Sequence, residues 1–191
     1  MRILGISGSL RKDSHNTALL RAAAELLPPG VELELFDGLR DVPPYDADED
    51  VPELHAPGVL ALKDAIERAD AVLIATPEYN HSIPGQLKNA LDWASRPAGK
   101  SALNGKPAAA IGASTGMFGA VWAQAETRKV LSALGGRVVE AELPVARASE
   151  LLAGDRLELE PQQSEQLEEL LAELVASAEE AEESARERVA A

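Results

Sequence analysis

Five polar side chains lie close together in residues 8–17, a segment that follows an apolar run and leads into a helical pattern: Ser9, Arg11, Ser14, Asn16 and Thr17. Backbone N–H groups at the start of a helix favour an anion, and an arginine presents a forked donor to phosphate oxygens. Capping the helix would need only one of the five residues. This first loop predicts a site for a lone phosphate group, because the sequence lacks the glycine patterns that hold a dinucleotide pyrophosphate or a triphosphate.

A second loop, residues 76–85, also follows an apolar run and precedes a helical pattern. It carries Pro77, Glu78, Tyr79 and Asn80. Proline stiffens the backbone, asparagine tolerates turn geometry, and tyrosine supplies an aromatic ring. A stiff loop of this kind suits the edge of a planar heterocycle, although an ordinary turn with Tyr79 on the surface would explain it as well.

The third loop, residues 113–119, carries Ser114, Thr115 and Gly116, small residues that let the backbone approach a flat ligand. Residues 112–116 also match the Gly-x-Ser-x-Gly pattern of serine hydrolases, in which the histidine base follows the serine along the chain. All three histidines of this chain precede Ser114. The order of residues therefore disfavours a hydrolase.

No metal-ligand set can be recognised, because the chain has no cysteine and its three histidines are scattered. We expect His15 and His81 to be donors in their loops and His55 to be incidental. Glu78 is the only carboxylate that invites an acid or base role, and a structural role in its loop explains it better. The sequence therefore nominates no catalytic residue and no metal ligand.

The elements that position these loops alternate between apolar runs and helical patterns, as in a parallel α/β sheet. Strands are expected at residues 2–7, 31–36, 71–76, 107–113 and 137–143. Helices are expected at residues 16–27, 57–68, 84–95, 119–134 and 162–178. Five strands alternating with five helices predict an α/β flavodoxin-like three-layer sandwich with a five-stranded parallel sheet in the order 2-1-3-4-5. In such sheets ligands bind at the carboxyl ends of the strands, where all three loops fall.

Composition restricts the function further. Without cysteine the chain has no disulfide, thiolate or redox-active thiol, so redox chemistry would need a bound cofactor. The net charge of −14 argues against nucleic acid or an anionic membrane as partner, and no apolar run is long enough to span a bilayer. The start of the chain indicates a strand and not a signal peptide, so we expect a cytoplasmic protein.

The acidic charge is concentrated at the end of the chain, where residues 155–191 carry twelve acidic and three basic side chains. The apolar helical stripe stops at Ala178. We expect one flavodoxin-like domain over residues 1–178 and an acidic helical extension or tail over residues 179–191. The Asp- and Pro-rich residues 37–57 form a long irregular connection.

With residues 8–17, 77–93 and 105–116 taken together, the chain resembles the NADPH-dependent FMN reductase family, which includes quinone, azo-dye and chromate reductases. The resemblance covers most of residues 1–151 and implies FMN as cofactor and NADPH or NADH as co-substrate. It places the phosphate on the first loop and the isoalloxazine ring against Pro77, Glu78, Tyr79 and Asn80. Ser114, Thr115 and Gly116 would close the ribityl and ring side.

The implied activity is transfer of a hydride from NAD(P)H through bound flavin to a small-molecule acceptor, such as a quinone, free flavin, an azo compound or a metal oxyanion. Tyr79 and Phe118 are the candidates to wall the ring site. The resemblance also implies a homodimer or homotetramer, in which Leu87, Leu91 and Trp93 would be contact residues unless they are core. A flavodoxin-type electron carrier and a non-enzymatic FMN-binding protein are the alternatives.

Overall fold

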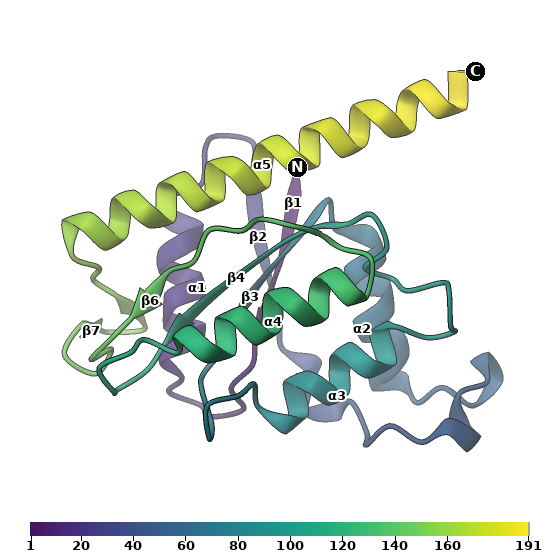
Figure 1. Ribbon diagram of the computed structural model, residues 1–191, viewed down its shortest axis with the longest axis horizontal. Coiled ribbons are helices and arrows are strands. Elements are labelled where there is room, and N and C mark those ends of the chain that lie inside the picture. Colours follow the sequence, from purple (N-terminus) through teal and green to yellow (C-terminus); the bar gives the residue numbers. More distant parts are fainter. Residues whose placement is uncertain (191) are drawn as a thin grey trace.

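The strands of the computed structural model, which describes residues 1–190, form a parallel sheet between two layers of helices (Figure 1). They are β1 (Arg2–Ser7), β2 (Glu32–Phe36), β3 (Ala71–Ala75), β4 (Pro107–Ala113) and β5 (Arg137–Val138). Their order is β2-β1-β3-β4-β5, and each neighbouring pair is parallel. The predicted flavodoxin-like fold and strand order are therefore confirmed.

Five helices cover the two faces of this sheet: α1 (His15–Glu25), α2 (Pro57–Arg68), α3 (Gly85–Ala94), α4 (Val121–Ala133) and α5 (Pro161–Ala190). Because side chains alternate along a strand, Leu73 of β3 packs in the core with α1 and α5, while its neighbours Val72 and Ile74 pack with α2, α3 and α4. Every residue of β3 and β4 is buried, as expected of central strands.

The fifth strand differs from the sequence-based expectation, which had it continuous over residues 137–143. It is divided into β5 and a second short strand, β6 (Pro144–Val145), and both pair with β4. The fully buried Gln124 of α4 explains part of this division. Its Oε1 accepts the backbone N–H of Leu143 (2.9 Å) and its Nε2 donates to the carbonyl of Gly119 (3.0 Å). The Gln124 side chain thus accepts the Leu143 N–H, a hydrogen-bond donor that a continuous strand would direct to its neighbour.

The C-terminal part of the chain also departs from the expectation. A small antiparallel hairpin, β7 (Leu152–Ala153) and β8 (Arg156–Leu157), precedes α5 and was not foreseen. Helix α5, by contrast, continues past the apolar stripe that ends at Ala178, so the expected extension is helical as far as Ala190, and residue 191 lies outside the described residues. Figure 1 shows its last turns projecting beyond the sheet. None of the helices described over residues 1–190 is both long and apolar enough to cross a membrane.

The irregular connection after β2 contains three short 3₁₀ turns, η1 (Gly38–Asp41), η2 (Ala47–Glu49) and η3 (Pro52–Leu54). Polar side chains on one face of α3 hold it. Gln86 Nε2 donates to the carbonyls of Leu39 and Val42 (both 2.8 Å), and Asn89 Nδ2 (2.8 Å) and Trp93 Nε1 (2.9 Å) donate to the carbonyl of Pro43. These bonds fix the carboxyl-end rim beside β2.

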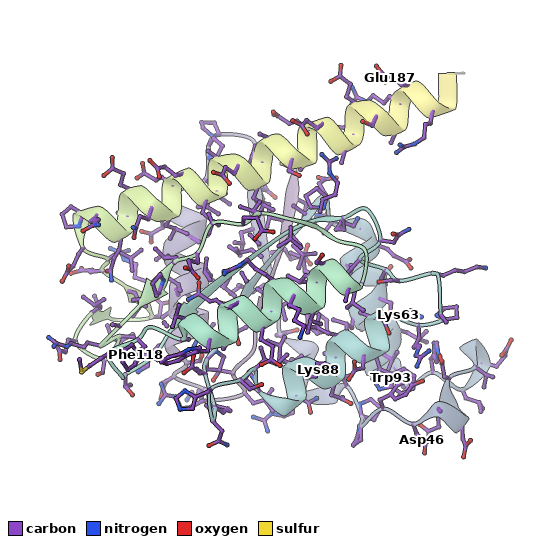
Figure 2. The ribbon with its side chains drawn as sticks, viewed as in Figure 1. Asp46, Lys63, Lys88, Trp93, Phe118 and Glu187 are labelled. Carbon is purple, nitrogen blue, oxygen red and sulfur yellow. The ribbon has the colours of Figure 1, made fainter. Side chains whose placement is uncertain are left out.

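Leu87, Leu91 and Trp93 of α3 are all buried within this chain, at 2% exposure or less. Figure 2 labels Trp93, which lies against the irregular connection. Of the two explanations considered for these three residues, core packing is the one that applies.

Candidate functional site

A pocket opens at the carboxyl ends of β1, β3 and β4, where the three loops meet. Its lining comes from the three loops and the first turn of α1: Ser9, Arg11, Ser14, His15, Asn16, Pro77, Glu78, Tyr79, Ala113, Ser114 and Thr115. Nine of the twelve residues predicted from the sequence are among them, and only Thr17, Asn80 and Gly116 lie outside the lining. The topology thus brings together loops that are up to a hundred residues apart.

Ser14 and Arg11 give the first loop its capacity for an anion. Ser14 caps α1, since its Oγ accepts the N–H groups of Asn16 (3.2 Å) and Thr17 (3.3 Å), and this leaves its hydroxyl hydrogen to donate. The Arg11 side chain is exposed and forms no ion pair within residues 1–190. Thr17 instead donates to Ser7 Oγ (3.0 Å), on the far side of the loop.

Asn16 has a structural role that the sequence did not indicate. Its Nδ2 donates to the carbonyl of Ala113 (3.0 Å), and its Oδ1 accepts the N–H of the same residue (2.9 Å). The side chain is 3% exposed. Ala113 ends β4 beyond the last residue that pairs with β3, so the amide of Asn16 completes the ladder there. Asn16 therefore fastens the first loop to the third, and this geometry does not favour the phosphate contact predicted for it.

The second loop contains a tight turn that leaves the Tyr79 side chain exposed to solvent. Tyr79 and Ser82 exchange two backbone hydrogen bonds (3.0 and 3.1 Å), and the two central residues, Asn80 and His81, have φ of 55° and 61°. Positive φ at both centres defines a type I′ turn, for which asparagine is among the best residues. Asn80 therefore shapes the turn at its tip, and Tyr79 is left 55% exposed beside the pocket.

Glu78 has a structural role, as predicted, although its carboxylate contacts helix α4 and not only its own loop. Its Oε2 accepts the N–H groups of Trp122 (3.1 Å) and Ala123 (3.2 Å) in the first turn of α4. Helix α4 needs this external cap because its own N-cap residue is Ala120, which has no side-chain acceptor. The carboxylate is also favourably placed at the positive end of the helix dipole.

Aromatic side chains gather at the surface where α4 begins. Trp122 makes edge-to-face contacts with Phe118 (centroids 5.0 Å apart) and with His81 (4.9 Å). Phe118 is 60% exposed and Trp122 42% exposed. Figure 2 shows Phe118 at the outside of the molecule, beside the first turn of α4. Phe118 is one of the two residues predicted to wall the ring site. Trp122 falls inside the helix expected over residues 119–134, and no signal in the sequence marks it as a site residue.

His15 lines the pocket although it was not among the predicted binding residues. Its Nδ1 atom is buried and has no hydrogen-bond partner in the part of the chain that the structure describes. Burial, and secondly the positive charge of Arg11, hold the pKa of His15 below its usual range. A neutral imidazole whose Nδ1 has no hydrogen-bond partner among the described residues is thus available to a ligand in this pocket.

The arrangement does not form a hydrolase triad. Within residues 1–190 no hydrogen bond joins Ser114 Oγ to a histidine, and nothing there orients His15 through its Nδ1. A serine nucleophile needs a base that a third group holds in place. The same described residues contain no cluster of three or more histidine, aspartate or glutamate side chains that could hold a metal ion.

Comparisons with known proteins all indicate the same family. The model of the family described as NADPH-dependent FMN reductase matches residues 1–150. An NAD(P)H-dependent FMN reductase of Pseudomonas aeruginosa is 50% identical over 132 residues, which is 69% of either chain. A quinone reductase of Escherichia coli K12 is 38% identical over 139 residues, or 73% of either chain.

Among solved structures, the flavoenzyme NAD(P)H:(acceptor) oxidoreductase FerB of Paracoccus denitrificans superposes with a TM-score of 0.79 at 38% identity. The superposition covers 94% of this chain and 98% of FerB. The chain belongs to the NADPH-dependent FMN reductase family of oxidoreductases.

Proposed function

We propose that this chain binds FMN in the pocket between the three loops and uses NADPH or NADH to reduce a small-molecule acceptor, a quinone or a free flavin. The proposal rests on one observation: a single pocket holds both a helix start suited to an anion and a wall of small residues. Ser14 and Arg11 lie at the helix start, and Ala113, Ser114 and Thr115 form the wall.

The residues present fit a flavin mononucleotide. The free hydroxyl hydrogen of Ser14, the start of α1 and the guanidinium of Arg11, which has no ion-pair partner among the described residues, suit a phosphate monoester. The small residues of the third loop leave room for a flat ring system, and the exposed ring of Tyr79 stands at its edge. When bound, FMN supplies two-electron redox chemistry, which no side chain of this chain can provide.

The protein's own contribution is to bind, to orient and to exclude water. Ser9, Arg11 and Ser14 would hold the phosphate, and the backbone of the second loop would meet the ring edge. Glu78 is committed to α4, so it is not available as an acid or base. The exposed rings of Tyr79, Phe118 and Trp122 offer apolar walls against which a planar acceptor or nicotinamide could stack.

The remaining expectations are part of the same proposal. We expect a cytoplasmic enzyme that binds neither nucleic acid nor membranes. We also expect a homodimer or homotetramer, which is supported by the exposed apolar side chains at the mouth of the pocket, Met117 (73% exposed), Phe118 and Trp122. Sedimentation velocity at micromolar concentration measures the assembly state directly.

The binding test compares FMN with riboflavin, which lacks the phosphate. In Arg11→Ala, loss of a charge-assisted contact should weaken FMN binding by about 1.5–3 kcal/mol, roughly ten- to a hundredfold in Kd, and leave riboflavin binding unchanged. Arg68→Ala, which removes an exposed arginine on α2, is the matched control. Equal affinity of the wild-type protein for FMN and riboflavin would contradict the phosphate site.

The catalytic test is NADPH oxidation by FMN-loaded protein with a quinone as acceptor. Steady-state turnover supports the reductase. A protein that retains FMN but oxidises neither NADPH nor NADH would instead be an electron carrier or a flavin-binding protein.

A further inference from the structure

A second hollow borders the flavin pocket on the other side of the first loop. It lies between that loop, the flank of α1 and the carboxyl end of β2, and it shares Ser9 and Arg11 with the pocket. We call it the β2 groove. Nothing in the proposed binding of FMN uses its remaining residues, although a molecule that lies over the flavin could reach it across the first loop.

The β2 groove is strongly cationic in a chain whose net charge is −14. Besides Arg11 it is lined by Lys12, Arg21 and Arg40, against one carboxylate, that of Asp37. Arg21 is already paired with Asp155 (3.6 Å). No carboxylate pairs with Lys12 or Arg40 within residues 1–190. Two exposed cations are therefore free to neutralise an anion.

Arg40 is also held in place. Its Nη2 donates to the backbone carbonyl of Leu10 (2.7 Å), which joins η1 to the first loop across the groove. The guanidinium keeps further N–H donors for a ligand. An arginine positioned in this way loses less side-chain entropy on binding than one that is free to rotate.

The floor of the β2 groove is apolar. Leu35 and Phe36 at the end of β2 are half-buried, and Leu39 of η1 is buried. An apolar floor with one aromatic ring beneath a cationic rim is complementary to an aromatic base whose sugar carries a phosphate. In the proposed reaction FMN occupies the first-loop phosphate site. The ligand left to fill such a groove is the nicotinamide nucleotide.

NADPH differs from NADH by a single phosphate on the 2′-oxygen of its adenosine ribose. We infer that the β2 groove binds the 2′-phosphoadenosine end of NADPH, with Lys12 and Arg40 on the phosphate, and that the enzyme consequently prefers NADPH to NADH. The inference rests on the proposed function. It adds which of the two nucleotides the enzyme prefers and which residues, Lys12 and Arg40, determine that preference.

The activity test measures kcat/KM for NADPH and for NADH with one quinone and saturating FMN. Lys12→Gln should lower the NADPH value at least about tenfold and change the NADH value less than about twofold, since only NADPH carries the second phosphate. Arg40→Gln should act in the same direction, with FMN content measured by absorbance because Arg40 also contacts the first loop. Lys100→Gln, which removes an exposed lysine far along the chain, is the matched control.

A binding test needs no turnover. Adenosine 2′,5′-bisphosphate, titrated into FMN-loaded protein by calorimetry, should bind more tightly than 5′-AMP or inorganic phosphate, and Lys12→Gln should remove that advantage. Equal loss of NADPH and NADH activity in Lys12→Gln, or equal binding of the bisphosphate and 5′-AMP by the wild type, would overturn the inference. Failure of the proposed function looks different, because the wild-type protein would then bind no FMN or oxidise neither nucleotide.

Discussion

Replacing Asn16 by alanine tests how the site is held together before any ligand binds. The substitution deletes the two hydrogen bonds that join α1 to the end of β4 and leaves the N–H and the carbonyl of Ala113 without partners. Ala113 is 2% exposed. A buried backbone group without a partner costs about 1–3 kcal/mol. The two groups together predict a loss of roughly 2–6 kcal/mol of unfolding free energy, where the lower end applies if water from the pocket reaches them.

The measurement is urea unfolding of FMN-free protein, because a bound cofactor would add its own stabilisation. In thermal unfolding of a chain of this size, the same loss lowers Tm by roughly 4–24 °C. Asn104→Ala, at an exposed asparagine, should change the unfolding free energy by less than about 0.5 kcal/mol. Asn16→Asp keeps an acceptor for the N–H but sets a second oxygen against the carbonyl of Ala113, so it should not rescue stability. A change within about 0.5 kcal/mol in Asn16→Ala would refute the structural role of this amide.

Three further predictions concern the other side chains of the pocket. Glu78→Gln should lower the unfolding free energy by about 1–2 kcal/mol, because a neutral amide caps α4 less well than a carboxylate, while NADPH turnover at saturating FMN should persist. The pKa of His15 in the folded protein lies below the usual 6.5, so its contribution to stability is fully present above pH 6.5 and is lost as the pH falls below that value. The unfolding free energy of FMN-free His15→Asn should therefore decline less steeply below pH 6.5 than that of the wild type. Parallel plots of unfolding free energy against pH for the two proteins would contradict this. Ser114→Ala should still reduce a quinone, with FMN retention weaker by about 0.5–1.5 kcal/mol and restored by excess FMN, and a serine-dependent esterase activity in flavin-free protein would contradict the flavin assignment.

The fold could be predicted from the sequence because its signals are local. The runs at β3 and β4 are apolar throughout, which only strands covered on both faces can accommodate. The helical patterns between them fix the crossovers and hence a parallel sheet. The position of the pocket followed from the same logic, since parallel strands end at one edge and their loops must meet there.

The features that the sequence did not reveal have a common cause in contacts between residues distant in the sequence. Gln124 divides the fifth strand from 19 residues away, and Glu78 caps a helix that begins more than 40 residues later. Asn16 and Ala113 are separated by 97 residues. None of these pairs leaves a periodic or capping pattern in the sequence, because each partner is a backbone group that any residue carries.

These contacts also change what the polar composition of the first loop means. Five polar residues are more than helix capping requires, and the sequence alone therefore predicts phosphate binding from all five. Two of the five have structural roles that leave their side chains fewer groups for a ligand: Asn16 completes a ladder, and Thr17 is bonded to Ser7. Backbone groups beyond the ends of strands lack ladder partners, so polar side chains gather there whether or not a ligand binds. The evidence for a phosphate is therefore the donors left over, Ser9, Arg11 and Ser14, and of these Arg11 alone is charged, which makes it the decisive residue to substitute.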